Sequence, residues 1–170
     1  QDMLCASIEK DLREDLIHQY TMEKEKIYQD LCLKTNMQLT EGAEDLFRFL
    51  SSGNIPYTIA TASGIENVDF YFQHMNLSEF FNYNKIIYND LSMKSKPDPD
   101  LFIKAMTVLD ARADETLIFE DSFSGIRAAE NARVGKIIIV NSNNNNYDEW
   151  NYQVIHSFDE VDRNIFSKTS

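Results

Sequence analysis

From residue 57 onward, short apolar runs alternate with helical patterns, and this alternation limits the possible folds more than any other feature. The runs are rich in β-branched and aromatic residues and are bounded by turn residues, which is typical of buried strands. We expect these strands at 57–62, 85–88, 116–119, 136–140 and 154–156. Strands that alternate with helices form a parallel sheet with helices on both faces. The chain is therefore predicted to have an α/β, Rossmann-like core.

The first 40 residues follow a different pattern. Between residues 7 and 33, apolar residues recur about every four positions and charged residues fill the gaps, which predicts one or two amphipathic helices. We therefore divide the chain into a helical segment at 1–40 and an α/β core at 41–170. Helices of the core are expected at 42–52, 65–75 and 123–132, and a final helix from Phe158 onward. The segment Pro97-Asp98-Pro99 is expected to open a further helix, with Asp98 as its N-cap and Pro99 in its first turn.

The composition and charge of the chain argue against some classes of partner. The formal net charge of −12 repels nucleic acid and anionic membranes, so neither is an expected partner. A phosphorylated substrate would need a locally positive site. Cys5 and Cys32 have no metal-ligand spacing and are expected to be reduced structural thiols. No apolar run reaches the length of a membrane span. We expect a cytoplasmic monomer or weak homodimer.

Three groups of polar residues follow predicted strands or lie near their ends, where parallel α/β folds bind their ligands. Thr61 ends the first strand and is followed by Ala62 and Ser63, so a hydroxyl and loop N–H groups there could hold an anionic oxygen. Lys96, held by the following proline, could place a positive charge over a phosphate. Taken singly, these two signals also fit an ordinary turn and a surface lysine.

The third group, Glu120-Asp121-Ser122, carries more information. It follows three apolar residues of a predicted buried strand. Capping of the next helix explains one of these polar residues but leaves a second carboxylate without a structural role. Carboxylate oxygens are ligands that Mg²⁺ prefers, and Mg²⁺ commonly keeps phosphate oxygens in its coordination shell. Glu120 and Asp121 are therefore predicted to hold Mg²⁺ for phosphate chemistry, with Thr61 and Lys96 on the phosphoryl group.

Together these motifs resemble the haloacid dehalogenase (HAD) superfamily, in particular its β-phosphoglucomutase-like phosphatases with a helical cap. The matching segments are Ile59-Ala60-Thr61-Ala62-Ser63, Lys96-Pro97-Asp98-Pro99-Asp100 and Phe119-Glu120-Asp121-Ser122, followed by Gly125-Ile126 and Ala128-Ala129. The resemblance implies that Thr61 binds the phosphoryl group and that Lys96 stabilises a phosphoaspartyl intermediate. It also implies that Asp121 ligates Mg²⁺, that Glu120 ligates or supports it, and that residues 1–40 are part of the cap.

One family motif, an Asp-x-Asp that supplies the nucleophile and the general acid, has no match. The only Asp-x-Asp is Asp98-Pro99-Asp100, which lies between Lys96 and a predicted helix rather than after an apolar strand. We expect the nucleophile, the central strand and the first part of the cap to precede Gln1. The chain alone is then expected to be inactive, and segments 57–62 and 116–120 lack the strand that would lie between them.

These observations leave three functions open. The first is a Mg²⁺-dependent phosphatase that hydrolyses a small phosphorylated metabolite, with sugar phosphates among the candidates, through a phosphoaspartyl intermediate. The second is a β-phosphoglucomutase-like sugar-phosphate mutase. The third is a catalytically inactive HAD-like binding protein, for which the missing nucleophile motif is the one argument.

Overall fold

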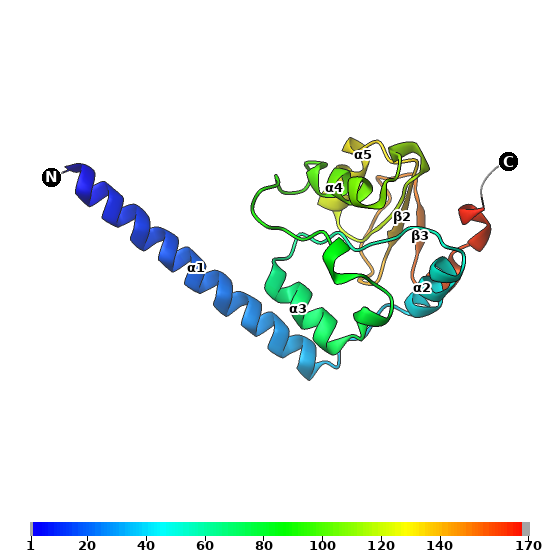
Figure 1. Ribbon diagram of the computed structural model, residues 1–170, viewed down its shortest axis with the longest axis horizontal. Helices are drawn as coiled ribbons and strands as arrows, with labels where there is room; N and C mark the ends of the chain where they lie inside the picture. The colour runs from blue at the N-terminus through cyan, green and yellow to red at the C-terminus, as the bar shows by residue number, and fades with distance from the viewer. Residues whose placement is uncertain (1, 168–170) are drawn as a thin grey trace. The chain divides into compact units, whose positions relative to one another are not determined.

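The computed structural model describes the backbone of residues 2–167 and the side chains of residues 13, 16 and 19–167. The chain divides into two compact units, one up to Gln38 and one from Leu39 onward (Figure 1). The first unit contains α1 (Asp2–Lys34), a single continuous helix where the sequence allowed one or two. No helix in the described part of the chain is both long and apolar enough to span a membrane.

Several of the regularly spaced apolar residues of α1 are exposed. Leu16, Tyr20, Ile27 and Leu31 are between 51% and 69% exposed. Cys32 is a buried free thiol, as predicted, whereas Cys5 lies outside the described side chains.

The second unit is built on a three-stranded parallel sheet, which confirms the predicted α/β fold. The strands are β1 (Leu117–Glu120), β2 (Lys136–Val140) and β3 (Gln153–Ile155), in the spatial order β1-β2-β3. In the register, Glu120 lies opposite Ile139, and Val140 lies opposite Ile155. Strand β2 is the central strand of the three and is buried from Ile137 to Val140, as its continuous apolar run predicts.

Both faces of the sheet are covered. On one face lie α4 (Asp100–Leu109) and α5 (Phe123–Asn131), and their side chains share a core with Ile118 and Ile137. Ala128 and Ala129 of α5 are fully buried, and their small size lets the helix approach the strands closely. The other face packs against Val161, Phe158 and two short 3₁₀ helices, η4 (Phe158–Glu160) and η5 (Arg163–Phe166).

The remaining helices of this unit are α2 (Ala43–Ser52) and α3 (Ile65–His74), followed by the 3₁₀ turns η1 (Leu77–Glu79) and η2 (Tyr83–Lys85). A further 3₁₀ turn, η3 (Ala113–Glu115), precedes β1.

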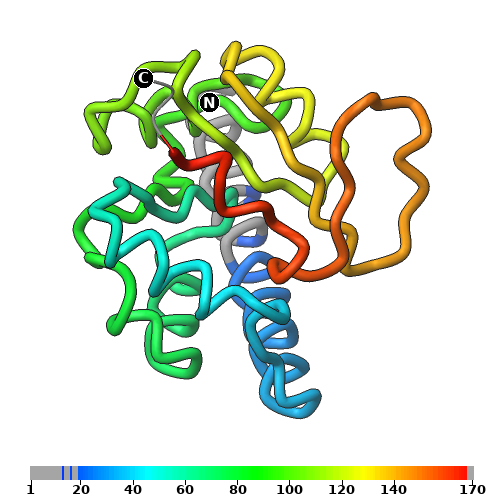
Figure 2. Tube along the Cα trace, turned by 90° about the vertical axis from the view of Figure 1, so that its right-hand side faces the viewer, coloured from blue at the N-terminus to red at the C-terminus, as the bar shows by residue number. Residues whose placement is uncertain are grey.

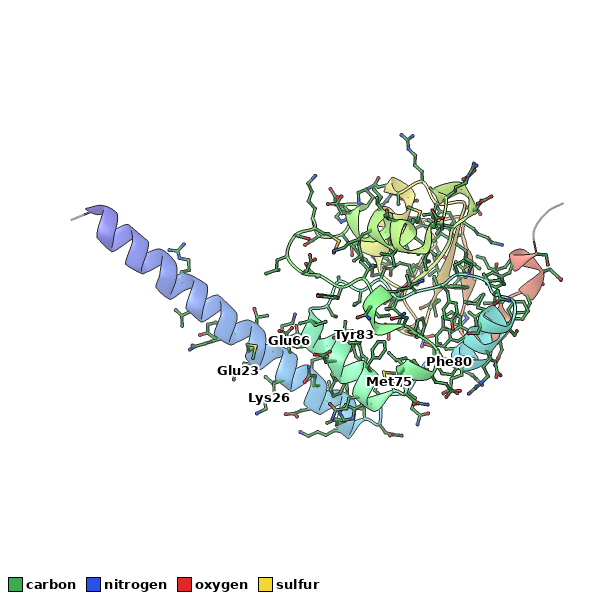
Figure 3. All side chains as sticks on the ribbon, in the orientation of Figure 1. Glu23, Lys26, Glu66, Met75, Phe80 and Tyr83 are labelled. Carbon is green, nitrogen blue, oxygen red and sulfur yellow. The ribbon has the colours of Figure 1, made fainter. Side chains whose placement is uncertain are left out.

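An aromatic cluster joins α2 to the segment after α3. Phe47 contacts Phe80 and Phe81, with ring centroids 5.4 Å and 4.8 Å away. Phe80 lies beside α2 (Figure 3), where the Arg48 guanidinium stands over its ring at 5.0 Å.

The strands expected at 57–62 and 85–88 do not form. They are reduced to one parallel bridge between Ala60 and Ile87, held by Thr61 N to Ile87 O at 2.8 Å and Ile87 N to Ile59 O at 2.9 Å. Among the described residues, no strand pairs with the other edge of the 57–62 segment. Two strands without further neighbours are only marginally stable, which explains why the extended segments stop at a bridge.

Two helix boundaries also differ from the prediction. The N-cap of α4 is Pro99 rather than Asp98, although the Asp98 side chain still accepts a hydrogen bond from Asp100 N at 3.3 Å. The helix expected from Phe158 onward is broken into η4 and η5. Ser157 caps the first, and the Asp162 side chain accepts from Asn164 N at 2.9 Å to start the second, so a local cap competes with helix continuation.

The turn before α2 requires glycine. Gly42 has a φ of 77°, and a Cβ there would lie 2.5 Å from Asp159 N and 2.5 Å from Asp159 Oδ1. We expect Gly42→Ala to lower the free energy of unfolding by about 1–3 kcal/mol, because it adds both backbone strain and a clash. Gly53, at the other end of α2, has a φ of −82° and is the matched control. Urea unfolding of both variants tests this, and equal effects would contradict it.

Candidate active site

The two predicted metal-binding residues lie at the carboxyl end of β1. Glu120 is the last residue of the strand, and Asp121 and Ser122 connect it to α5. The Ser122 side chain accepts a hydrogen bond from Gly125 N at 3.0 Å, which makes it the N-cap of α5. A strand that ends directly at a helix N-terminus presents backbone N–H groups at the same edge, where negative charge is favoured.

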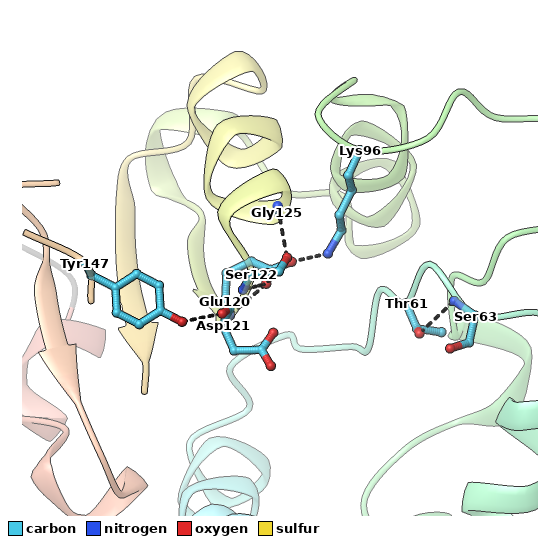
Figure 4. Close-up of polar contacts among 8 residues, drawn as sticks. All are labelled: Thr61, Ser63, Lys96, Glu120, Asp121, Ser122, Gly125 and Tyr147. Carbon is cyan, nitrogen blue, oxygen red and sulfur yellow. Dashed lines mark hydrogen bonds and ion pairs between the residues drawn. The ribbon is translucent and has the colours of Figure 1, made fainter. Parts of the chain in front are cut away.

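Glu120 is buried, and both of its carboxylate oxygens have partners. One carboxylate oxygen, Oε1, forms an ion pair with Lys96 Nζ, and both side chains are largely buried, with exposed fractions of 6% and 14% (Figure 4). The other, Oε2, accepts hydrogen bonds from Asp121 N at 2.7 Å and Ser122 N at 2.9 Å. Burial alone would raise the pKa of Glu120, but the Lys96 ammonium and these N–H donors outweigh it and hold the pKa below its usual range.

Asp121 is in the opposite electrostatic situation. Burial and the negative charge of neighbouring Glu120 raise the pKa of the Asp121 carboxyl above its usual value. Among the described residues, no lysine, arginine or histidine forms an ion pair with it. Of the two acids, Asp121 is therefore the one that has no ion-pair partner among the described residues.

Lys96 is held in place by contacts from two helices. Its Nζ lies 5.1 Å from the centroid of the Phe102 ring in α4. The loop that carries it is tied to the last residue of α5, because Asn131 Nδ2 donates to the Pro97 carbonyl at 2.9 Å. The structure thus brings Lys96 to Glu120, although the two residues are 24 positions apart in the chain.

Thr61 and its neighbours form a separate part of the candidate site. Thr61 Oγ1 accepts from Ser63 N at 3.1 Å, and the Ser63 carbonyl accepts from Asn89 N at 3.0 Å, so the turn is ordered, while Ala62 is exposed. Figure 4 shows Thr61 and Ser63 on their own loop, apart from Lys96 and the acid pair. Three of the predicted residues, Lys96, Glu120 and Asp121, are brought together, and the Thr61 turn stands away from them.

Whether these residues fit a magnesium ion depends on the donor set. In the described part of the chain, no cluster of three or more His, Cys, Asp or Glu side chains forms a ready-made metal cage. Mg²⁺ is often bound through one or two carboxylates, and waters and substrate phosphate oxygens complete its shell. Asp121, a carboxylate with no ion-pair partner among the described residues, fits that kind of site.

Two residues that support the site were missed by the sequence analysis. Tyr147 donates a hydrogen bond from its hydroxyl to the backbone carbonyl of Asp121, and no local motif signals a contact across 26 residues. Gly125 faces the Glu120 carboxylate so closely that a Cβ would overlap it. A glycine early in a helix is a usable signal, since glycine there has a cost unless something approaches the backbone.

Removing the lysine tests the buried ion pair. We expect Lys96→Met to lower the free energy of unfolding by about 3–5 kcal/mol, because it leaves Glu120 buried without its counter-charge. Lys94 is the matched control, since its side chain is 78% exposed and pairs with Asp98 at 3.5 Å in solvent. Urea unfolding at neutral pH measures both variants. A Lys96→Met protein as stable as Lys94→Met would contradict the argument.

Adding a methyl group tests the close approach of α5 to Glu120. We expect Gly125→Ala to destabilise the protein by about 1–3 kcal/mol, because the Glu120 carboxylate must move away from Lys96 or from the loop N–H groups. Gly53→Ala serves as the control, because a Cβ added at Gly53 would lie 3.2 Å from the nearest side-chain atom, Ile55 Cδ1. An unchanged unfolding midpoint for Gly125→Ala would show that the carboxylate has another place to go.

The curated relatives of this chain include proteins named as phosphatases. The chain is 33% identical over 111 residues to a probable pseudouridine-5'-phosphatase of Drosophila melanogaster, covering 63% of this chain and 48% of that protein. It is 26% identical over 151 residues to a phosphorylated carbohydrates phosphatase of Thermotoga maritima, covering 89% and 60%. The chain thus spans about half the length of these curated relatives.

A solved structure and a family model extend the match. The crystal structure of a HAD hydrolase, family IA, variant 3, from Entamoeba histolytica superposes with a TM-score of 0.82 at 35% identity and covers 87% of this chain and 68% of that one. The model of the haloacid dehalogenase-like hydrolase family matches residues 2–139. The resemblance seen in the motifs is confirmed, and the chain belongs to the haloacid dehalogenase-like hydrolase family.

Proposed function

We propose that this protein is a Mg²⁺-dependent phosphatase that hydrolyses a small phosphorylated metabolite through a phosphoaspartyl intermediate. The observation that carries the proposal is the cluster at the end of β1, where Lys96 pairs with Glu120 and leaves Asp121 with no ion-pair partner among the described residues. The relatives named above as phosphatases of pseudouridine 5'-phosphate and phosphorylated carbohydrates support the substrate class.

The charge of the cluster favours a divalent cation. With Lys96 protonated and both carboxylates ionised, the three side chains carry one more negative than positive charge. Such a cluster repels a phosphate group, and the net charge of −12 on the chain adds to this repulsion. A bound Mg²⁺ would reverse the local sign and neutralise charge on the phosphoryl oxygens.

Each residue has a distinct proposed role. Asp121 would hold the metal. Lys96 would place its ammonium near a phosphoryl oxygen, where a fixed positive charge stabilises the transition state more than it would in water. Glu120, whose oxygens are already occupied by Lys96 and backbone donors, would orient the lysine and the acid loop rather than contact the metal.

The Thr61 turn would supply hydrogen bonds to the phosphoryl group. Its hydroxyl and the N–H groups of Ala62 and Ser63 lie in one short segment, and such groups bind phosphate oxygens without carrying charge. The Ser63 N–H now donates to Thr61 Oγ1 at 3.1 Å, so a bound phosphate would exchange this internal hydrogen bond for one to the ligand.

We assign no nucleophile among these residues. Asp98 and Asp100 form the only Asp-x-Asp pair, but both carboxylates are used locally. Asp98 pairs with Lys94 at 3.5 Å, and Asp100 accepts from Lys94 N at 3.2 Å. These contacts stabilise the start of α4 and argue against Asp98 or Asp100 as the attacking group.

Replacing the proposed metal ligand tests this function in the full-length protein. We expect Asp121→Asn to abolish calorimetrically detected Mg²⁺ binding and to lower kcat on small phosphate esters by about 10²–10³, because charge stabilisation of the transition state is lost. Asp45→Asn, which removes an exposed carboxylate in the first turn of α2, is the control and should change neither quantity.

The outcomes separate the candidate functions. Release of inorganic phosphate supports a phosphatase, whereas isomerised sugar phosphate without net release would point to a mutase. If the unaltered full-length protein binds Mg²⁺ but turns over no phosphate ester, the proposal of a phosphatase is wrong and a binding role replaces it.

A further inference from the structure

The loop between β2 and β3 reaches back to the candidate site through one tyrosine. This loop, residues 141–152, extends from the edge of the sheet and is drawn in orange in Figure 2. Its first turn is closed by two reciprocal hydrogen bonds, from Asn141 Nδ2 to the Asn145 carbonyl and from Asn145 N to Asn141 Oδ1, both 2.9 Å long. Two residues later, Tyr147 turns inward and is 5% exposed.

The ring of Tyr147 is fixed on several sides. It meets the Phe123 ring edge-on, with centroids 5.3 Å apart and an interplanar angle of 88°. It also packs against Ile126 of α5 and Ile139 of β2. Edge-to-face aromatic contacts and burial hold such a ring in one orientation, so the position of its hydroxyl is determined by the surrounding core.

That hydroxyl donates to the backbone carbonyl of Asp121 (Figure 4). Both backbone polar groups of Asp121 are therefore held by side chains, because its N–H donates to Glu120 Oε2 at 2.7 Å. A residue whose N–H and C=O are both anchored has little freedom to rotate, and its Cα–Cβ bond keeps one direction.

We propose that Tyr147 is a positioning residue for the divalent-cation site. By anchoring the Asp121 carbonyl, it aims the Asp121 carboxylate in the direction needed to bind the metal before the metal arrives. This inference rests on the proposed function of Asp121. Groups that orient a ligand without touching the metal commonly affect metal affinity strongly.

The alternative is that Tyr147 only packs the loop against the sheet. Both roles predict a loss of stability when the tyrosine is altered, so stability cannot separate them. Metal affinity can, because a purely structural tyrosine would leave the ligand's direction unchanged in the folded protein.

The chain offers a matched control. Tyr57 also donates its hydroxyl to a backbone carbonyl, that of Phe80 at 2.8 Å, and its ring also packs against aromatic side chains, Phe47 and Phe81. Tyr57→Phe and Tyr147→Phe each remove a phenolic hydroxyl that donates to a main-chain oxygen, and Tyr57→Phe also removes a 2.6 Å hydrogen bond to Ser51 Oγ. Only the Tyr147 bond involves the acid loop.

The experiment uses the full-length protein and Mn²⁺ as a spectroscopic substitute for Mg²⁺. Free Mn²⁺ is measured by electron paramagnetic resonance during titration of the unaltered protein and of both variants, and melting temperatures are recorded without metal. We expect Tyr147→Phe to weaken Mn²⁺ binding about two- to tenfold, the equivalent of one net hydrogen bond. Tyr57→Phe should lower the melting temperature to a similar extent and leave Mn²⁺ affinity unchanged.

Three contrary results are distinguishable. If the unaltered protein binds Mn²⁺ and Tyr147→Phe binds it equally well while remaining folded, the positioning role is wrong and the proposed function stands. If the unaltered protein binds no Mn²⁺, the metal-dependent function fails and the role of Tyr147 fails with it. An equal loss of affinity in both tyrosine variants would also overturn the inference, because the effect would then be general.

Discussion

The buried ion pair between Lys96 and Glu120 organises the carboxyl end of the sheet. It connects the loop before α4 to the last residue of β1, and through Asn131 and the Pro97 carbonyl the same loop is tied to the end of α5. A buried charge is tolerated only when its partner and its hydrogen bonds are complete. Glu120 meets this condition with one ammonium and two backbone N–H donors, so the loop geometry and the charge balance depend on each other.

This pair also divides the work between two adjacent acids. The charge of Glu120 is balanced inside the protein by Lys96. Lys96 and the N–H donors lower the pKa of Glu120 despite its burial. Asp121 has no ion-pair partner among the described residues, and desolvation together with the negative charge of Glu120 raises its pKa. Two identical functional groups thus acquire different chemistry from their surroundings, which is why we propose the metal for Asp121 alone.

Prediction from sequence succeeded where the local residue pattern alone is enough to determine the element. The apolar run at 136–140 formed the buried strand β2, and the alanine-rich segment after Ser122 formed α5 against it. It failed where an element needs a partner. The apolar run at 57–62 has strand character, but only Ile87 pairs with it among the described residues, so it remains a bridge. It also failed at Phe158, where the Asp162 cap competes with continuation of the helix.

By itself the sequence determined the α/β class, the family resemblance and the identity of the polar residues near the ends of the strands, because these depend on residue type and order along the chain. Only the tertiary structure decided which of these residues meet. It joined Lys96 to Glu120, left Thr61 on its own loop and brought the Tyr147 hydroxyl to the Asp121 carbonyl. Contacts across 24 or 26 residues depend on how helices and loops pack, and no local spacing encodes them.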